Sequence, residues 1–283
     1  MRCLVLVSLV AACGSQAAAP APATPLRPPV AALGLPLGPP LVTPGEHMTY
    51  KLALQGVELA AFDLAVGDPA ALGGKQAIVV QSHAKTVGIV KMVANIDDVF
   101  TSWIDVATGR PLRWTTDEYA TRGTDKERTD ASFAGRTGNS LPIEFHVNDE
   151  PPKSEPQTVA LPDAWDFNSF LVALRVWSPP AGSSVVAEVL RSRFMWHVEM
   201  TVHGKEQVTT ALGTLPAIRL DGRTYKLDRA GARDPDSDER SFSIWISDDD
   251  GRVPLQIVAK TDYGEMKMEI TDYSPGSGQR LRR

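Results

Sequence analysis

The sequence predicts a mainly β protein. Its antiparallel sheet is expected to be strongly curved, as a partly open barrel or a sandwich, with one amphipathic helix at about residues 165–176. Apolar and polar residues alternate with a period of two through most of the chain, which is typical of strands. Turns rich in glycine and aspartate separate these runs, and strands joined by short turns pair antiparallel. No repeat of fixed length appears, so a solenoid or a propeller is excluded.

The first half of the chain shows this alternation between residues 48 and 54, where Gln55-Gly56 then predicts a hairpin turn. Residues 67–74 begin and end with glycines and are expected to form a loop. The apolar run at 76–82 suits a strand that is buried on both faces. Residues 139–162 contain five prolines and few apolar pairs, so we expect a long connection there.

The clearest strand lies at residues 193–203. One face is expected to be core and the other to meet solvent, because side chains alternate across a strand. The predicted core face consists of Phe194, Trp196, Val198, Met200 and Val202. The predicted solvent face consists of Arg193, His197, Glu199, Thr201 and His203.

One segment has the spacing of a helix. Phe167, Leu171 and Leu174 lie at i, i+4 and i+7, which places them on one helical face. Asp163 is the expected N-cap, and the prolines at 179 and 180 end the segment. A single amphipathic helix among many strands is expected to pack on a sheet face or to plug the mouth of a barrel.

The chain begins with an export signal. Residues 1–12 have a charged start, a short apolar stretch and small residues before the cleavage point, as a secretory signal has. Val10-Ala11-Ala12-Cys13 resembles a lipobox, which implies cleavage before Cys13 and attachment of diacylglycerol to its thiol. Palmitate is expected among the attached acyl chains, and the membrane is therefore the first expected partner.

Cysteine usage agrees with lipidation. Cys3 and Cys13 are the two cysteines of the chain, so cleavage leaves one, and it has no partner for an intramolecular disulfide. Lipidation would consume this otherwise free thiol. Gly14 and Ser15 are not the aspartate that signals retention in the inner membrane, so the resemblance favours the outer membrane, with the domain facing the periplasm.

Composition divides the mature chain into three parts. Residues 13–44 are expected to be a lipidated tether rich in proline and alanine, because dense proline favours an extended polyproline conformation. Residues 45–274 are expected to form a single β-rich domain, and residues 275–283 a basic tail. Removing Arg2 with the signal leaves 28 basic and 34 acidic residues, a net charge of −6. This balance argues against nucleic acid as a partner.

The order of several short motifs carries a family resemblance. They are Gly45-Glu46 before a strand ending in Lys51-Leu52, Asp98-Val99-Phe100-Thr101-Ser102-Trp103-Ile104-Asp105, Thr108-Gly109-Arg110-Pro111, the helix around Phe170 to Trp177, Val202-His203-Gly204-Lys205-Glu206, Leu212-Gly213-Thr214, Ile244-Trp245-Ile246-Ser247-Asp248-Asp249 and Arg252-Val253-Pro254. This order resembles the exported bacterial family called domain of unknown function 3108. The resemblance covers nearly all of the folded part except residues 139–162. It implies one β-rich envelope domain, by analogy with the curved sheets of lipoprotein-carrier proteins, and brings no catalytic residues.

Two groups of residues carry side chains that can bind a metal ion. His197, Glu199 and His203 share a face, but positions six apart on a strand are about 20 Å apart, so the two histidines cannot hold one ion. His197 with Glu199 would supply two zinc ligands, yet a solvated face is the preferred interpretation.

The second group imitates the start of a calcium loop with Asp234, Asp236 and Asp238. The position that needs glycine holds Glu239, and the twelfth position holds Trp245 instead of glutamate. We therefore predict no metal site and no cofactor.

No sequence motif indicates catalysis. The chain has no G-x-S-x-G elbow and no glycine-rich nucleotide loop. Six tryptophans and seven methionines are present, and they suit either an ordinary core or an apolar cavity. The leading hypothesis is a non-catalytic lipoprotein that binds an apolar or amphiphilic envelope molecule, or a partner protein, through residues that remain unknown. The alternative is a hydrolase that acts on an envelope polymer.

Overall fold

The computed structural model describes residues 34–88, 96–119 and 125–282. The predicted signal, Cys13 and most of the predicted tether lie outside the described residues. The described residues form mainly strands, with one helix, α1 (Phe167–Val176). The strands are β1 (Glu46–Leu54), β2 (Val57–Leu72), β3 (Lys75–Thr86), β4 (Asp97–Asp105), β5 (Pro111–Tyr119), β6 (Lys126–Ser132), β7 (Ser140–Leu141), β8 (Ile143–Val147), β9 (Lys153–Ser154), β10 (Gln157–Thr158), β11 (Ala164–Asp166), β12 (Ser184–Arg191), β13 (Phe194–Thr210), β14 (Gly213–Lys226), β15 (Arg240–Ser247), β16 (Pro254–Thr261) and β17 (Gly264–Pro275).

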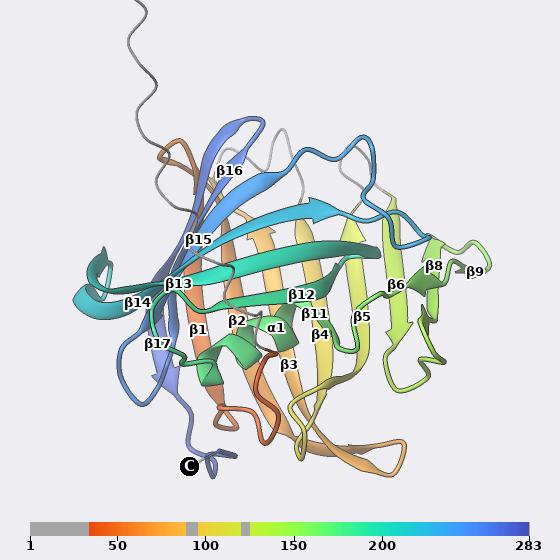
Figure 1. The fold of residues 1–283 in the computed structure, drawn as a ribbon, viewed down its shortest axis with the longest axis horizontal. Coiled ribbons are helices and arrows are strands. Elements are labelled where there is room, and N and C mark those ends of the chain that lie inside the picture. Colours follow the sequence, from red (N-terminus) through yellow and green to blue (C-terminus); the bar gives the residue numbers. More distant parts are fainter. Residues whose placement is uncertain (1–33, 89–95, 120–124, 283) are drawn as a thin grey trace, which may run out of the picture.

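One large sheet contains fifteen of the described strands. Its order is β11-β12-β13-β14-β15-β16-β17-β1-β2-β3-β4-β5-β6-β8-β9, while β7 and β10 form a separate pair. The sheet curls strongly, and its two outermost described strands are not paired with each other, so it does not close into a barrel (Figure 1). This confirms the predicted fold class. All described pairings within it are antiparallel except β11 with β12, which is parallel.

The rolled sheet encloses two apolar cores. The larger core collects inner-face residues from β1 to β4 and from β12 to β17 around α1. The smaller core joins Trp114, Ala131 and Ile143 of β5, β6 and β8 to Leu190 and Met195 of β12 and β13. The β12–β13 hairpin therefore has apolar neighbours on both faces, since the adjacent pair Val189 and Trp196 belongs to the larger core.

The helix begins later than predicted. Trp165 and Asp166 belong to β11, where pairing with β12 overrides helix formation, and α1 starts at Phe167. Its N-cap is Asp166 and not Asp163: the Asp166 side chain accepts from the Ser169 backbone amide, and the Ser169 hydroxyl reaches the Asp166 backbone. Asp163 instead forms an ion pair with Arg110. Figure 1 shows α1 within the curve of the sheet, in front of β1 to β3.

Three further predictions need correction. Residues 67–72 continue β2 after a register shift between Val66 and Pro69, and only Gly73 and Gly74 turn the chain, with φ of 56° and 79°. Residues 139–162 are not a plain connection, because β8 lies within them and pairs with β6. The strand at 76–82 is buried mainly on one face, since Gln81 is exposed. Prolines obscured β8 because they flank short strands instead of interrupting them.

Both described ends of the chain pack against the larger core, which also contains α1. Leu35 and Val42, from the segment assigned to the tether, are buried in the larger core. Leu281, from the predicted tail, packs on the same core and donates its backbone N–H to the Val42 carbonyl. These apolar side chains bury surface that a free tether would leave in water, so the folded domain includes residues before 45.

Candidate functional site

The inner face of the sheet is buried at one end and accessible at the other. Along β1, Tyr50 is 2% exposed whereas Leu52 is half-buried. Along β15, Ile244 is buried whereas Phe242 is half-buried. The same change occurs along β4, β5, β13 and β17, always toward the end that carries the β16–β17 turn, at the top of Figure 1. We call this end the open end and the opposite one the closed end.

Helix α1 fills the closed end. Phe170, Leu171 and Leu174 are buried in the larger core. Beside them, the Arg175 guanidinium donates to both carboxylate oxygens of Glu46 at 2.9 and 2.8 Å, and both side chains are almost fully buried. Arg175 also donates to the Gly251 carbonyl. Because these hydrogen bonds compensate both buried charges, the structure with the pair is more stable than one in which either charge is buried alone.

Tyrosines complete this buried network. Burial, together with the neighbouring Glu46, raises the pKa of Tyr273 to about 12, and the Tyr273 hydroxyl donates to Glu46 at 3.0 Å. Burial also raises the pKa of Tyr50, whose hydroxyl donates to the Pro254 carbonyl. Arg252 donates to the Arg175 and Trp177 carbonyls at the C-terminus of the helix. The polar groups of the closed end are thus hydrogen-bonded to one another or to the backbone, and they hold α1 against the sheet.

The open end is lined by apolar side chains that stay half-buried. Phe242 is fixed there by Gly222 across the strands, because a Cβ at that position would lie 2.3 Å from the phenyl ring. Trp196 points to the inner face as predicted, although it is only half-buried. The apolar lining, defined by inner-face residues that keep part of their surface accessible, comprises Leu52, Ala84, Trp196, Phe242, Ile257 and Met266.

Charged residues complete the inner face of the open end. Glu118 of β5 accepts from the Ser192 hydroxyl at 2.6 Å, and burial raises the pKa of its carboxyl. Asp98 of β4 accepts from the Tyr119 backbone amide, and burial raises its pKa as well. Arg191, the last residue of β12, lies opposite them on the inner face and is exposed. The arrangement is therefore amphiphilic, with an apolar lining and a charged border.

Two hairpin tips at this end carry exposed apolar side chains. Val57 after the β1–β2 turn is 62% exposed, and Tyr263 in the β16–β17 turn is 74% exposed. The Gln55 side chain donates to the Tyr263 carbonyl at 2.7 Å, so the two tips are adjacent. Two of the large apolar side chains that are exposed among the described residues therefore lie at this rim.

A buried polar cluster separates the two cores. Asp166 accepts from the Ser102 hydroxyl at 2.5 Å, and burial raises the pKa of its carboxyl to about 6. Its second carboxylate oxygen has no partner among the described residues. Asn168 accepts from the Ser82 hydroxyl and donates to the Val80 and Phe100 carbonyls. No described histidine contacts this cluster, and Ser102 and Asp166 are both fully buried.

The structure separates the residues considered as metal ligands. His197 lies on the outer face, stacks on Tyr225 at 4.8 Å between ring centroids, and approaches Glu199 at 3.5 Å. His203 pairs instead with Asp221 at 3.2 Å. Asp234 forms an ion pair with Lys226, which lowers its pKa. Within the described ranges, no group of three or more histidine, cysteine or acidic side chains is placed to hold a metal ion.

Two shallow grooves lie on the outer face of the sheet. The larger, of about 620 Å³, crosses β13 to β17 and contains the ion pair of Arg223 with Glu199 and that of Arg219 with Asp221. The smaller, of about 430 Å³, crosses β4 to β8. No histidine lines the larger groove, and four of its charged groups form these two ion pairs, so it shows neither convergent catalytic groups nor a continuous apolar lining.

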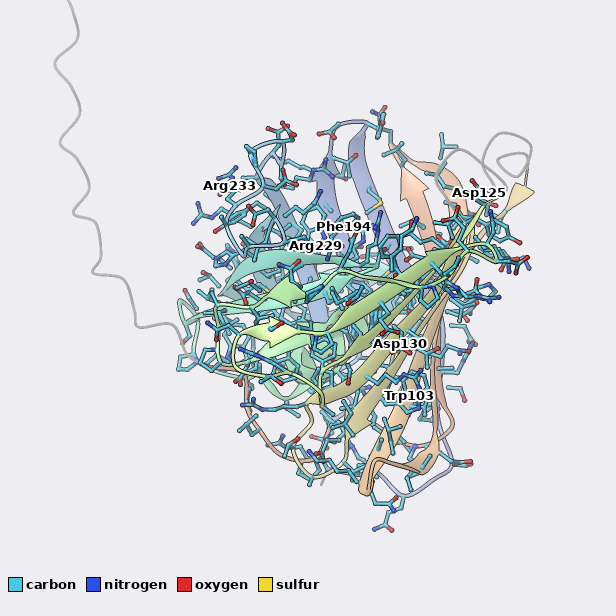
Figure 2. The ribbon with its side chains drawn as sticks, turned by 90° about the vertical axis from the view of Figure 1, so that its right-hand side faces the viewer. Trp103, Asp125, Asp130, Phe194, Arg229 and Arg233 are labelled. Carbon is cyan, nitrogen blue, oxygen red and sulfur yellow. The ribbon has the colours of Figure 1, made fainter. Side chains whose placement is uncertain are left out.

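Contacts between cations and aromatic rings link strands near the two edges of the sheet. The Arg193 guanidinium lies 4.1 Å from the centre of the Phe145 ring and forms an ion pair with Glu127 at 2.8 Å. Phe194 and Arg229 lie close together, above the strands that bear Asp130 and Trp103 (Figure 2). The Arg193 contacts cross from the β12–β13 turn to β6 and β8, so they help to hold the hairpin in position.

Sequence reasoning missed the charged residues of the open end. Arg191, Asp98 and Glu118 all lie in register with apolar residues of their own strands. The sequence does show a charged residue at an inward position where each apolar alternation ends. Whether such residues form one site depends on which strand ends come together, and this is decided by the rolled sheet.

Comparisons with known proteins place the fold. The crystal structure of a β-barrel-like protein of the domain of unknown function DUF1849 from Brucella abortus is similar, with a TM-score of 0.52, 7% identity, and coverage of 83% of this chain and 99% of that one. An exported protein with a YmcC-like fold from Bacteroides fragilis gives 0.37 at 5% identity, covering 84% and 99%. The structure described as "the hypothetical lipoprotein YmcC from Escherichia coli" gives a TM-score of 0.30 at 10% identity, covering 82% of this chain and 86% of that one.

No curated protein matches the chain. Within the described ranges, no helix combines the length and the apolar character that crossing a bilayer requires. Residues 47–271 match the family model described as "Protein of unknown function (DUF3108)", which confirms the resemblance drawn from the motif order. The match covers most of the chain and nearly all of the rolled sheet. The chain therefore belongs to the DUF3108 family.

Proposed function

We propose that this protein is a non-catalytic cell-envelope lipoprotein that binds an apolar or amphiphilic molecule in the open end of its rolled sheet. The observation that carries the proposal is the exposure gradient of the inner face. Side chains such as Trp196, Phe242 and Ile257 belong to an apolar surface that α1 covers at the other end. Apolar surface left accessible costs about 25 cal/mol per Å², so a bound apolar molecule would recover that free energy.

The location follows from the N-terminal residues. Signal cleavage before Cys13 and acylation of its thiol would anchor the domain to the outer membrane, facing the periplasm. The proline-rich residues that follow Cys13 would act as the tether. This proposal is tested by Cys13→Ala, which should abolish membrane fractionation, and by mass spectrometry of the wild-type N-terminal peptide. A wild-type peptide without lipid on Cys13 would refute it.

An apolar ligand accounts for the site better than a partner protein or a polymer-cleaving reaction does. The lining lies on the concave face, where a protein surface would have to enter the roll. The two carboxylates of the open end, Asp98 and Glu118, each accept a hydrogen bond from the protein, whereas a glycosidase needs two carboxylates free to act on either side of its substrate. The exposed tips at Val57 and Tyr263 lie on the same rim, where a hydrophobic molecule would enter or leave.

The binding experiment uses two neighbouring positions of β16. Ile257 lies on the inner face of the open end, and Val258 lies in the larger outer groove; both are half-buried. A tryptophan at position 257 should fill the proposed site, and one at position 258 should fill the outer groove instead. Binding of Nile red, a neutral apolar dye, would be measured by fluorescence on the full chain carrying Cys13→Ser.

We expect wild type and Val258→Trp to bind the dye and Ile257→Trp to lose most of the binding. Native mass spectrometry of wild type purified from its own membrane should also show a co-purifying apolar molecule. Circular dichroism controls for folding of both variants. Loss of binding in Val258→Trp with retention in Ile257→Trp would place the ligand on the outer face and refute the proposal.

A further inference from the structure

Arg191 is an outlier in β12. Val185, Ala187 and Val189 alternate on the inner face and are buried in the larger core, and Arg191 continues the same alternation. Its side chain therefore extends from the inner face just beyond the cross-strand pair of Val189 with Trp196. The apolar lining thus ends at a guanidinium, which is exposed to solvent at the open end.

The guanidinium of Arg191 lacks a described partner. It forms no ion pair or hydrogen bond with any side chain that the structure describes, whereas Arg193 beside it pairs with Glu127 and Glu155. Surrounding protein lowers the pKa of Arg191, which Glu118 opposes and Arg240 enhances. Because the guanidinium is exposed and has no described partner, its N–H donors are free to bind an incoming anion.

The neighbouring charges are already engaged. Arg240 forms an ion pair with Asp262 at 2.7 Å, and Glu118 accepts from the Ser192 hydroxyl at 2.6 Å. Glu118 is not within ion-pair distance of Arg191. Arg191 therefore stands as the one charged group at the border of the lining whose hydrogen-bonding capacity is unused among the described residues. A guanidinium presents a planar fork of donors that matches a carboxylate or a phosphate.

We propose that Arg191 binds the anionic headgroup, a carboxylate or a phosphate, of an amphiphile whose hydrocarbon chain lies along Trp196 and Phe242. The inference rests on the proposed function and adds the chemical class of the ligand. It also fixes the orientation: the headgroup lies at the border of the open end, and the chain points toward α1.

The test compares anionic and uncharged ligands of one chain length. Dodecanoic acid, dodecyl phosphate and dodecanol would each displace Nile red from the full chain carrying Cys13→Ser, in wild type, Arg191→Gln and Arg223→Gln. Arg223 is the matched control, an arginine on the outer face of β14. Arg191→Gln should weaken both anions roughly ten- to hundredfold, as loss of a charged hydrogen bond does, and dodecanol less than about twofold. Arg223→Gln should change none of them.

Each outcome decides a separate point. A loss confined to dodecanoic acid or to dodecyl phosphate supports the inference and identifies the headgroup. Equal effects of Arg191→Gln on the anions and on dodecanol, or no effect, would overturn the inference while leaving the proposed function intact. Failure of wild type to bind any of the three would overturn the proposed function and the inference with it. Partial recovery of the anions in Arg191→Lys would support a role of charge.

Discussion

The closed and open ends of the rolled sheet are built from the same strands and the same alternation, yet they differ in what covers them. At the closed end, α1 and both described chain ends bury the inner face, and the Glu46–Arg175 pair is enclosed. At the open end, the inner face keeps accessible apolar side chains beside an exposed arginine. A strand pattern therefore defines an inner face, while tertiary contacts decide whether that face becomes core or binding surface.

The buried ion pair should show the largest difference between the two ends. Arg175→Met leaves the Glu46 carboxylate buried without its partner, so we expect a loss of about 3–5 kcal/mol in the free energy of unfolding. Arg240→Met at the open end removes a pair with Asp262, which is largely exposed, and should cost about 1 kcal/mol or less. Urea unfolding of both variants measures this. Similar losses in the two would contradict the assignment of closed and open ends.

Methionine truncations sharpen the same contrast in the apolar lining. Met200 is 1% exposed, so Met200→Ala should cost about 2–5 kcal/mol as a core cavity. Met266, on the inner face of β17 at the open end, is half-buried, and Met266→Ala should cost about 1 kcal/mol or less. Thermal and urea unfolding give the comparison. If Met266→Ala proved the more damaging, the open end would be ordinary core.

Between the two cores, Asp166 should make stability depend on pH. Its folded pKa of about 6 exceeds the ordinary aspartate pKa of 3.8, so the folded state binds more protons between these values and stability falls as pH rises toward about 6. Asp166→Asn keeps a capping side chain without the charge. Near pH 7 it should be more stable than wild type by about 1–3 kcal/mol, and the difference should vanish below about pH 4. A gap that stays constant from pH 4 to about pH 7 in urea titrations would refute this burial effect.

The outer face should show the smallest effect. His197 stacks on Tyr225 and approaches only one carboxylate, so His197→Ala should cost about 0.5–1 kcal/mol, the range of a partly exposed aromatic contact. Metal analysis of wild type and variant should be identical. Stoichiometric metal that disappears in His197→Ala would restore the metal hypothesis and move the functional site to the outer face.

The sequence predicted the parts of this molecule that depend on local pattern. Val198, Met200 and Val202 are buried as their alternation indicated, and the motif order identified the family. The overlap of the sheet was beyond that reasoning. Leu190 and Met195 are buried on the face that alternation assigns to solvent, because β5, β6 and β8 pack over it. Arg191 can likewise be recognised as a residue of the inner face only when the position of β12 within the rolled sheet is known.

The central claim is that an amphiphile occupies the inner face at the open end. Photo-crosslinking with a fatty acid that carries a diazirine on its chain, followed by residue-level mass spectrometry, tests it directly. The account predicts labelling of Trp196, Ile257 and Met266, and competition by unlabelled dodecanoic acid. Labelling confined to the outer groove, at residues such as Trp245 and Val258, would contradict it.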